Sequence, residues 1–109
     1  MAVQPETRLQ NLIRLKISEE IPQCAIFRNS VGTFRTKDGA FVTAGLPPGS
    51  ADLIGIIEKD GVGVFVALEV KCPGEKPRPD QVAFLKRIRD LGGISGVVTS
   101  VEEALDMLR

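Results

Sequence analysis

Two apolar runs near the middle of the chain limit its possible folds more than any other feature. The run over 52–57 is typical of a buried strand, and the run over 62–71 is the longest strand candidate in the sequence. The turn signal Glu58-Lys59-Asp60-Gly61 separates the two runs, so we expect the two strands to pair antiparallel.

Helical and strand patterns continue on both sides of these runs. Apolar residues recur at helical spacing between Pro5 and Pro22, and Gly92-Gly93 ends a second helical pattern. We find no repeat, low-complexity tract or long linker, which predicts one α/β domain over residues 1–109. The further elements expected are a helix over 5–21, a strand over 25–29, hairpin strands over 33–36 and 40–43, a helix beginning at Pro79, a strand over 96–99, and a final helix capped by Ser100 with Glu103 as its capping-box partner.

Composition excludes several classes of site. The chain has no histidine, which excludes Ser-His-Asp and Cys-His nucleophile pairs and histidine-rich zinc sites. Cys24 and Cys72 are too few for a disulfide scaffold or a four-thiolate zinc site, so we expect buried or incidental thiols. The 14 basic residues equal the 14 acidic ones, which argues weakly against nonspecific coating of nucleic acid. Local basic clusters remain compatible with phosphate contacts.

The sequence carries neither a membrane-span pattern nor a secretion signal. No run approaches the ~20 apolar residues of a spanning helix, and the N-terminus lacks a basic segment followed by an apolar one. We therefore expect a soluble protein of the cytoplasm.

The strand segment that contains Glu69 and Lys71 carries the sharpest chemical signal. Because side chains alternate along a strand, Glu69 and Lys71 lie on one face, although an exposed sheet face would explain this pair equally well. Asp52 begins the other apolar strand, where aspartate is more often a turn or capping residue but can also bind a hard cation. Phosphodiester hydrolysis needs a cation on the phosphate and a positive group beside the attacking water. In the functional interpretation, Asp52 and Glu69 hold the metal and Lys71 positions the nucleophile.

Two helices add polar residues on otherwise apolar stripes. Glu6 shares a stripe with Ile13, and Gln81 shares one with Leu85. Each residue alone is more often a helix-start residue near solvent. Taken with Asp52 and the Glu-x-Lys strand, they predict that two helices and two strands supply polar groups to one site.

Five elements follow one another in a recognisable order: Glu6 in the first helix, Arg28-Asn29-Ser30-Val31-Gly32, Gly49-Ser50-Ala51-Asp52-Leu53, Leu68-Glu69-Val70-Lys71 and Gln81-Val82-Ala83-Phe84-Leu85. This order resembles the stand-alone VRR-NUC family, the virus-type replication-repair nucleases of the PD-(D/E)XK superfamily. The resemblance covers nearly the full chain. The Glu-x-Lys element is unspecific by itself, whereas five elements in order argue against chance. Ala51 stands where the family motif has a proline, a departure that is common in the superfamily.

The resemblance implies a restriction-endonuclease-like fold, in which a central mixed β-sheet is flanked by the first and third helices. It also implies Mg²⁺ or Mn²⁺ bound by Asp52, Glu69 and the backbone carbonyl of Val70. The other implied catalytic residues are the lysine Lys71 and two residues lining the same site, Glu6 and Gln81.

Basic and aromatic residues near the expected site are candidates for DNA contact. The basic candidates for phosphate binding are Arg28, Arg35, Lys37, Lys76 and Arg78, although each alone is more readily explained as a solvated surface charge. Phe34 and Phe41 could wedge against bases, but core packing is the favoured interpretation.

The resemblance implies endonucleolytic cleavage of DNA in a bacterial or phage-infected cell, with Holliday junctions as the expected substrate. We expect a homodimer joined through the apolar segment between Val31 and Leu46, because two cuts resolve a junction. Two other classes remain open. The chain could be a DNA-binding module that keeps the fold without cutting, or an assembly protein that uses a sheet edge and needs no metal.

Overall fold

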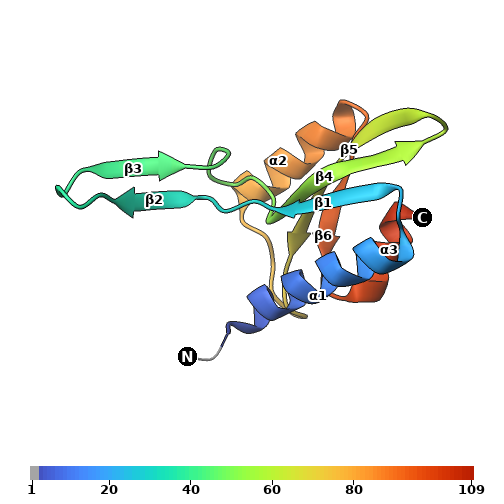
Figure 1. Ribbon diagram of the computed structural model, residues 1–109, viewed down its shortest axis with the longest axis horizontal. Helices are drawn as coiled ribbons and strands as arrows, with labels where there is room; N and C mark the ends of the chain where they lie inside the picture. Colours follow the sequence, from blue (N-terminus) through green and yellow to red (C-terminus); the bar gives the residue numbers. More distant parts are fainter. Residues whose placement is uncertain (1–2) are drawn as a thin grey trace.

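A four-stranded mixed sheet forms the centre of the computed structural model, which describes residues 3–109 (Figure 1). The strand order is β1 (Cys24–Arg28), β4 (Leu53–Lys59), β5 (Val62–Val70) and β6 (Ile94–Val98). The first three strands pair antiparallel, while β6 lies parallel to β5. A parallel pair needs a crossover, which helix α2 (Pro79–Asp90) supplies. The predicted α/β class with a central mixed sheet is therefore confirmed.

A tight turn sets the register of β5 on β4. Lys59 pairs with Val62, so only Asp60 and Gly61 form the turn, with φ angles of 53° and 80°. Positive φ at both central residues is typical of a type I′ turn, and Asp-Gly is a favoured sequence there. The same register pairs Leu53 with Leu68 at the other end of the hairpin. The residue before β4 and the residue after Leu68 are thereby brought side by side.

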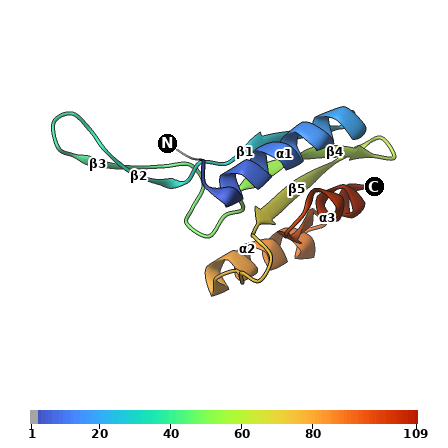
Figure 2. The same ribbon diagram turned by 90° about the horizontal axis from the view of Figure 1, so that it is seen from below.

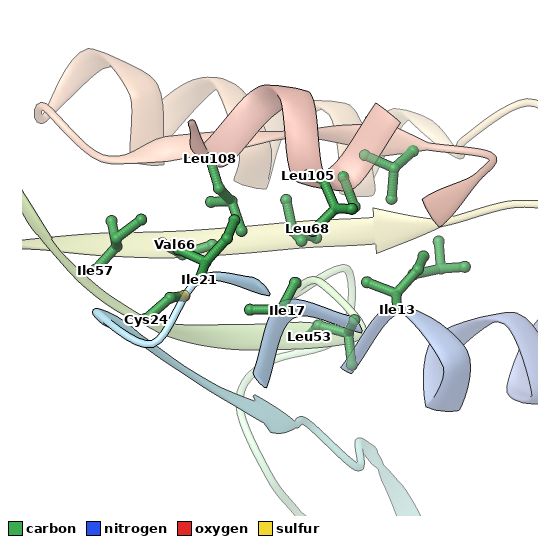
Figure 3. Packing of buried hydrophobic residues seen from close by; sticks show 13 residues of the cluster. Ile13, Ile17, Ile21, Cys24, Leu53, Ile57, Val66, Leu68, Leu105 and Leu108 are labelled. Atoms are coloured by element: carbon green, nitrogen blue, oxygen red, sulfur yellow. The ribbon is translucent and has the colours of Figure 1, made fainter. Parts of the chain in front are cut away.

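One face of the sheet carries the main hydrophobic core (Figure 3). Helices α1 (Pro5–Glu20) and α3 (Val101–Leu108) both pack on this face, as Figure 2 shows from below. The first and third helices therefore flank the sheet from the same side. Buried side chains that fill the core include Ile13, Ile17, Leu53, Ile57, Val66, Leu68, Leu105 and Leu108.

Helix α2 covers the opposite face only in part. It packs Leu85 against Ala51 and Ala67 in a second, smaller cluster. Beyond this cluster, the β1 and β4 part of the face is open, with Phe27 58% exposed and Ile56 50% exposed. None of the helices among the described residues has the length and apolar character that a membrane span requires.

A second, two-stranded sheet projects from the end of β1 as an arm (Figure 1). Its strands are β2 (Gly32–Arg35) and β3 (Phe41–Ala44), which pair only with each other. Phe34 is 54% exposed and Phe41 72% exposed, so the expectation that they pack in the core is wrong. The physical reason is that the arm leaves the sheet before its aromatic residues and never returns to the core.

Candidate functional site

A polar cleft of about 410 Å³ opens at one end of the sheet. Residues from α1, from the end of β1, from the segment before β4, from the end of β5 and from the start of α2 line it. Four of the five predicted catalytic residues are among these lining residues, namely Glu6, Asp52, Lys71 and Gln81, whereas Glu69 is not. Elements far apart in the sequence therefore bring these residues to one cleft.

Asp52 lines this cleft, and Glu69 is buried directly beside it, so the two residues form a linked pair of carboxylates. The Asp52 backbone N–H donates to Glu69 Oε1 at 3.3 Å, and Asp52 Oδ2 accepts from the Val70 backbone N–H at 2.9 Å. The register of β4 on β5 produces this arrangement, because it sets Asp52 beside Glu69. Glu69 is 1% exposed, and its Oε2 atom is buried without a hydrogen-bond partner.

The electrostatics of the pair favour a proton or a cation between the two acids. Burial raises the pKa of the Glu69 carboxyl to about 8, the Asp52 carboxyl adds to the rise, and Lys71 opposes it. An unpartnered carboxylate oxygen is a hard donor of the kind that Mg²⁺ and Mn²⁺ prefer. Across residues 3–109, no cluster of three or more His, Cys, Asp or Glu side chains is arranged to hold a metal. Asp52 and Glu69 are therefore the acidic side chains that lie close enough together to share a cation.

Glu6 and Lys71 share the environment of this pair. Burial raises the pKa of Glu6, Lys71 opposes the rise, and Asp52 and Glu75 add to it. The Lys71 backbone N–H donates to the Val98 carbonyl at 3.0 Å, which extends the pairing of β5 with β6 by one residue. Lys71 is thereby held at the edge of the cleft.

Gln81 lies at the start of α2 and is 6% exposed. Its Oε1 atom accepts from the Arg78 backbone N–H at 2.8 Å. The oxygen therefore caps the helix, which leaves the amide NH₂ group available to the cleft. Gln81 thus combines a structural bond with a place in the site lining.

Asn29 is a site residue to which the sequence assigned no role. Its Nδ2 atom donates to Ser50 Oγ at 2.9 Å and to the Ala51 carbonyl at 2.8 Å. Its backbone N–H donates to the Asp52 carbonyl at 2.8 Å. Three hydrogen bonds thus tie the end of β1 to the segment that carries Asp52. Its motif position was visible in the sequence, but the pairing of β1 with β4 that explains it was not.

The basic residues predicted to bind DNA fall into three places. Arg28 and Arg78 line the cleft. Lys76 lies in the connector after β5 and does not line it. Arg35 lies on the arm, 5.7 Å from the ring centroid of Phe41, and Lys37 is in the turn at the arm's tip. The structure therefore brings two of the five to the cleft.

Comparisons with known proteins agree on the type of domain. The sequence model of the VRR-NUC domain matches residues 16–102. A solved structure named as a VRR_NUC domain superposes with a TM-score of 0.63 at 21% sequence identity, covering 96% of this chain and 95% of that chain. No curated protein matches the chain. The family match includes Asp52, Glu69 and Lys71, whereas Glu6 precedes it. By sequence, and with a fold that agrees, the chain belongs to the VRR-NUC domain family.

Proposed function

We propose that this protein is a divalent-metal-dependent DNA endonuclease that hydrolyses phosphodiester bonds in the polar cleft. VRR-NUC is a family of nuclease domains, which supports DNA as the substrate. The observation that carries the proposal is the buried Oε2 atom of Glu69, which has no hydrogen-bond partner and lies in a carboxylate pair with Asp52. An ionised pair of this kind needs a cation to offset its burial.

The donor set fits Mg²⁺ or Mn²⁺. Asp52 and Glu69 would hold the ion together with the backbone carbonyl of Val70. Two carboxylates are sufficient, because Mg²⁺ keeps several of its waters when it binds to protein sites. When bound, the cation offsets charge on the scissile phosphate and lowers the pKa of a coordinated water.

The other residues act on the substrate and on water. Lys71 orients the attacking water with its ammonium group, and Glu6 and the amide of Gln81 lie around the same space. Arg28 and Arg78 at the rim of the cleft contact phosphates on the DNA strand. The basic groups of the arm, Arg35 and Lys37, contact phosphates farther from the cut.

Cleavage assays on linear, flap and four-way-junction DNA, with and without Mg²⁺ or Mn²⁺, test this function. Wild-type protein should cut only with metal. Asp52→Asn should remain folded and lose cleavage, because the carboxylate pair is broken, while Asp106→Asn on the exposed side of α3 should cut like wild type. Cutting by Asp52→Asn at the wild-type rate would reject the metal site. Metal-independent binding of DNA without cleavage by wild type would favour a non-catalytic DNA-binding module.

Branched DNA is the substrate that we propose, with a homodimer as the acting form. One domain with one site hydrolyses one strand per encounter, whereas resolution of a four-way junction needs two cuts. A two-fold dimer presents two equivalent sites to two strands. Paired nicks on junction DNA, compared with linear DNA of the same sequence, provide the test.

A further inference from the structure

Gln10 is a polar residue that lines the cleft without an assigned role. It lies on α1, one turn after Glu6, and is 7% exposed. Residues four apart lie on the same side of a helix, so Glu6 and Gln10 both face the cleft. Within residues 3–109, the Gln10 side chain makes no hydrogen bond to another protein group.

Gln10 stands where the buried side of α1 passes from the core to the cleft. Ile13 and Ile17, which follow on the buried side of α1, are fully enclosed in the core. The Gln10 amide itself makes no hydrogen bond within residues 3–109, so no partner in the fold requires an amide at this position. Packing therefore does not explain why an amide stands here.

The amide of Gln10 is also open to the contents of the cleft. Among the described residues, the polar side-chain atoms that are both sealed from solvent and unpartnered are Arg14 Nε and Glu69 Oε2. The amide atoms of Gln10 are not among them, although the residue as a whole is buried. What exposure remains to Gln10 thus leads into the cleft, where a bound molecule could meet its amide.

We infer that Gln10 is a substrate-contacting residue whose amide NH₂ donates a hydrogen bond to a phosphate oxygen of the DNA strand in the cleft. This inference rests on the proposed function. The acids Glu6 and Asp52 already supply acceptors to the cleft, and a phosphate oxygen needs donors. A neutral amide donates without competing for the metal or adding charge to the carboxylate pair.

Substitution of Gln10 separates this role from a structural one. In Gln10→Leu, thermal stability should stay the same or rise, while the single-turnover cleavage rate with Mg²⁺ should fall by about ten- to a hundredfold, as expected for a hydrogen bond to a charged group. Gln10→Glu keeps the length of the side chain but removes the donor, so it should be at least as slow. Asn11→Ala, on the exposed neighbouring position, is the matched control and should cut like wild type. A loss of stability in Gln10→Leu with an unchanged rate would assign the amide to packing and overturn the inference.

A measurement independent of cleavage uses the side-chain NH₂ signals of Gln10 in ¹⁵N–¹H spectra, assigned by their loss in Gln10→Leu. With Ca²⁺ present, addition of a short DNA duplex should shift these signals. A shift caused by Mg²⁺ alone, with no further change on adding DNA, would assign the amide to the metal's water and overturn the phosphate contact. DNA shifts confined to other cleft residues would overturn this contact while leaving the proposed function intact. No DNA-induced shift anywhere in the spectrum would reject both.

Discussion

Glu69 occupies a position where β5 otherwise places apolar side chains. Its neighbours Leu68 and Val70 are fully buried in the core, and Glu69 itself is 1% exposed. Burying an ionised carboxylate lowers the stability of the folded chain unless a partner compensates. The acid is therefore explained by what it binds and not by how it packs. In the metal-free protein, burial of this acid makes the free energy of unfolding depend on pH.

Metal-free protein should lose stability as pH rises, and Glu69→Gln should remove this loss. The pKa of Glu69 is about 8 in the folded state and 4.5 for the free group. The protonated carboxyl therefore contributes fully to the free energy of unfolding below pH 4.5, and this contribution is lost as pH rises through about 8. At pH 8 the substitution should raise the free energy of unfolding by a few kcal/mol at most, on the order expected for this pKa shift. Thermal unfolding in EDTA between pH 4.5 and 8.5 measures it. The control is Glu102→Gln on exposed α3, and parallel pH curves for wild type and Glu69→Gln would contradict the prediction.

Lys71→Ala should lower the rate of chemistry while leaving DNA affinity nearly unchanged. The residue follows the Glu69-Val70 segment directly and lines the cleft, where a positive group can orient water. Loss of one such preorganised group is expected to slow single-turnover cleavage by at least about a hundredfold. Rate and affinity are measured on the same DNA. If affinity fell in step with the rate, Lys71 would be a phosphate clamp instead.

Most individual elements could be predicted because local patterns determine them. The Pro5 start of α1 and the Asp60-Gly61 turn were visible in the sequence and occur as expected. Ser100 also caps α3, accepting from the Glu103 backbone N–H at 3.1 Å. The Glu103 carboxylate, however, accepts from the backbone N–H and hydroxyl of Thr99, so the capping box is displaced by one residue. This shift depends on the path of the chain from β6 into α3, which the local sequence pattern does not reveal.

The hydrogen bonds of Asn29 join the end of β1 to the segment before β4, and their removal should weaken the metal site more than the fold. Asn29→Ala deletes the two side-chain hydrogen bonds to Ser50 and the Ala51 carbonyl, at a cost of about 1–2 kcal/mol. The segment before β4 then holds Asp52 less firmly, so the Mg²⁺ concentration needed for half-maximal cleavage should rise severalfold. Ser18→Ala, exposed on α1, is the control. Recovery of the wild-type rate at saturating Mg²⁺ would support a positioning role, whereas a rate loss that metal cannot restore would contradict it.

Tertiary arrangement was less accessible to sequence reasoning than the elements. The family resemblance implied a first and a third helix beside the sheet but did not show that both would share one face. That outcome follows from the β4–β5 register and from the alternation that buries Val66 and Leu68 under both helices. The exposure of Phe34 and Phe41 was likewise invisible, because an apolar strand pattern does not reveal whether the strand joins the central sheet. The pairing of Asp52 with Glu69 follows directly from the antiparallel register of β4 on β5.

The projecting arm is the feature of the whole molecule that most requires an explanation. An isolated two-stranded hairpin is marginally stable in water. The two chain segments at its base pass close together, since a Cβ atom at Gly45, where φ is 85°, would lie 2.3 Å from the Ser30 carbonyl oxygen. Phe34, Phe41 and Val42 are 48–72% exposed along it. A projecting arm with exposed apolar residues is suited to packing on a second copy of the chain.

We therefore predict a homodimer joined through the segment between Val31 and Leu46. Light scattering at micromolar concentration should give about twice the 11.8 kDa mass of one chain. Phe34→Ser combined with Phe41→Ser should yield monomers that nick linear DNA but no longer cut both strands of a four-way junction, because the apolar contact is lost while the cleft is untouched. Ile56→Ser on the open sheet face is the control, since that face is the rival apolar surface. A monomer mass for wild type would reject the dimer, and monomers from Ile56→Ser alone would move the interface from the arm to the sheet.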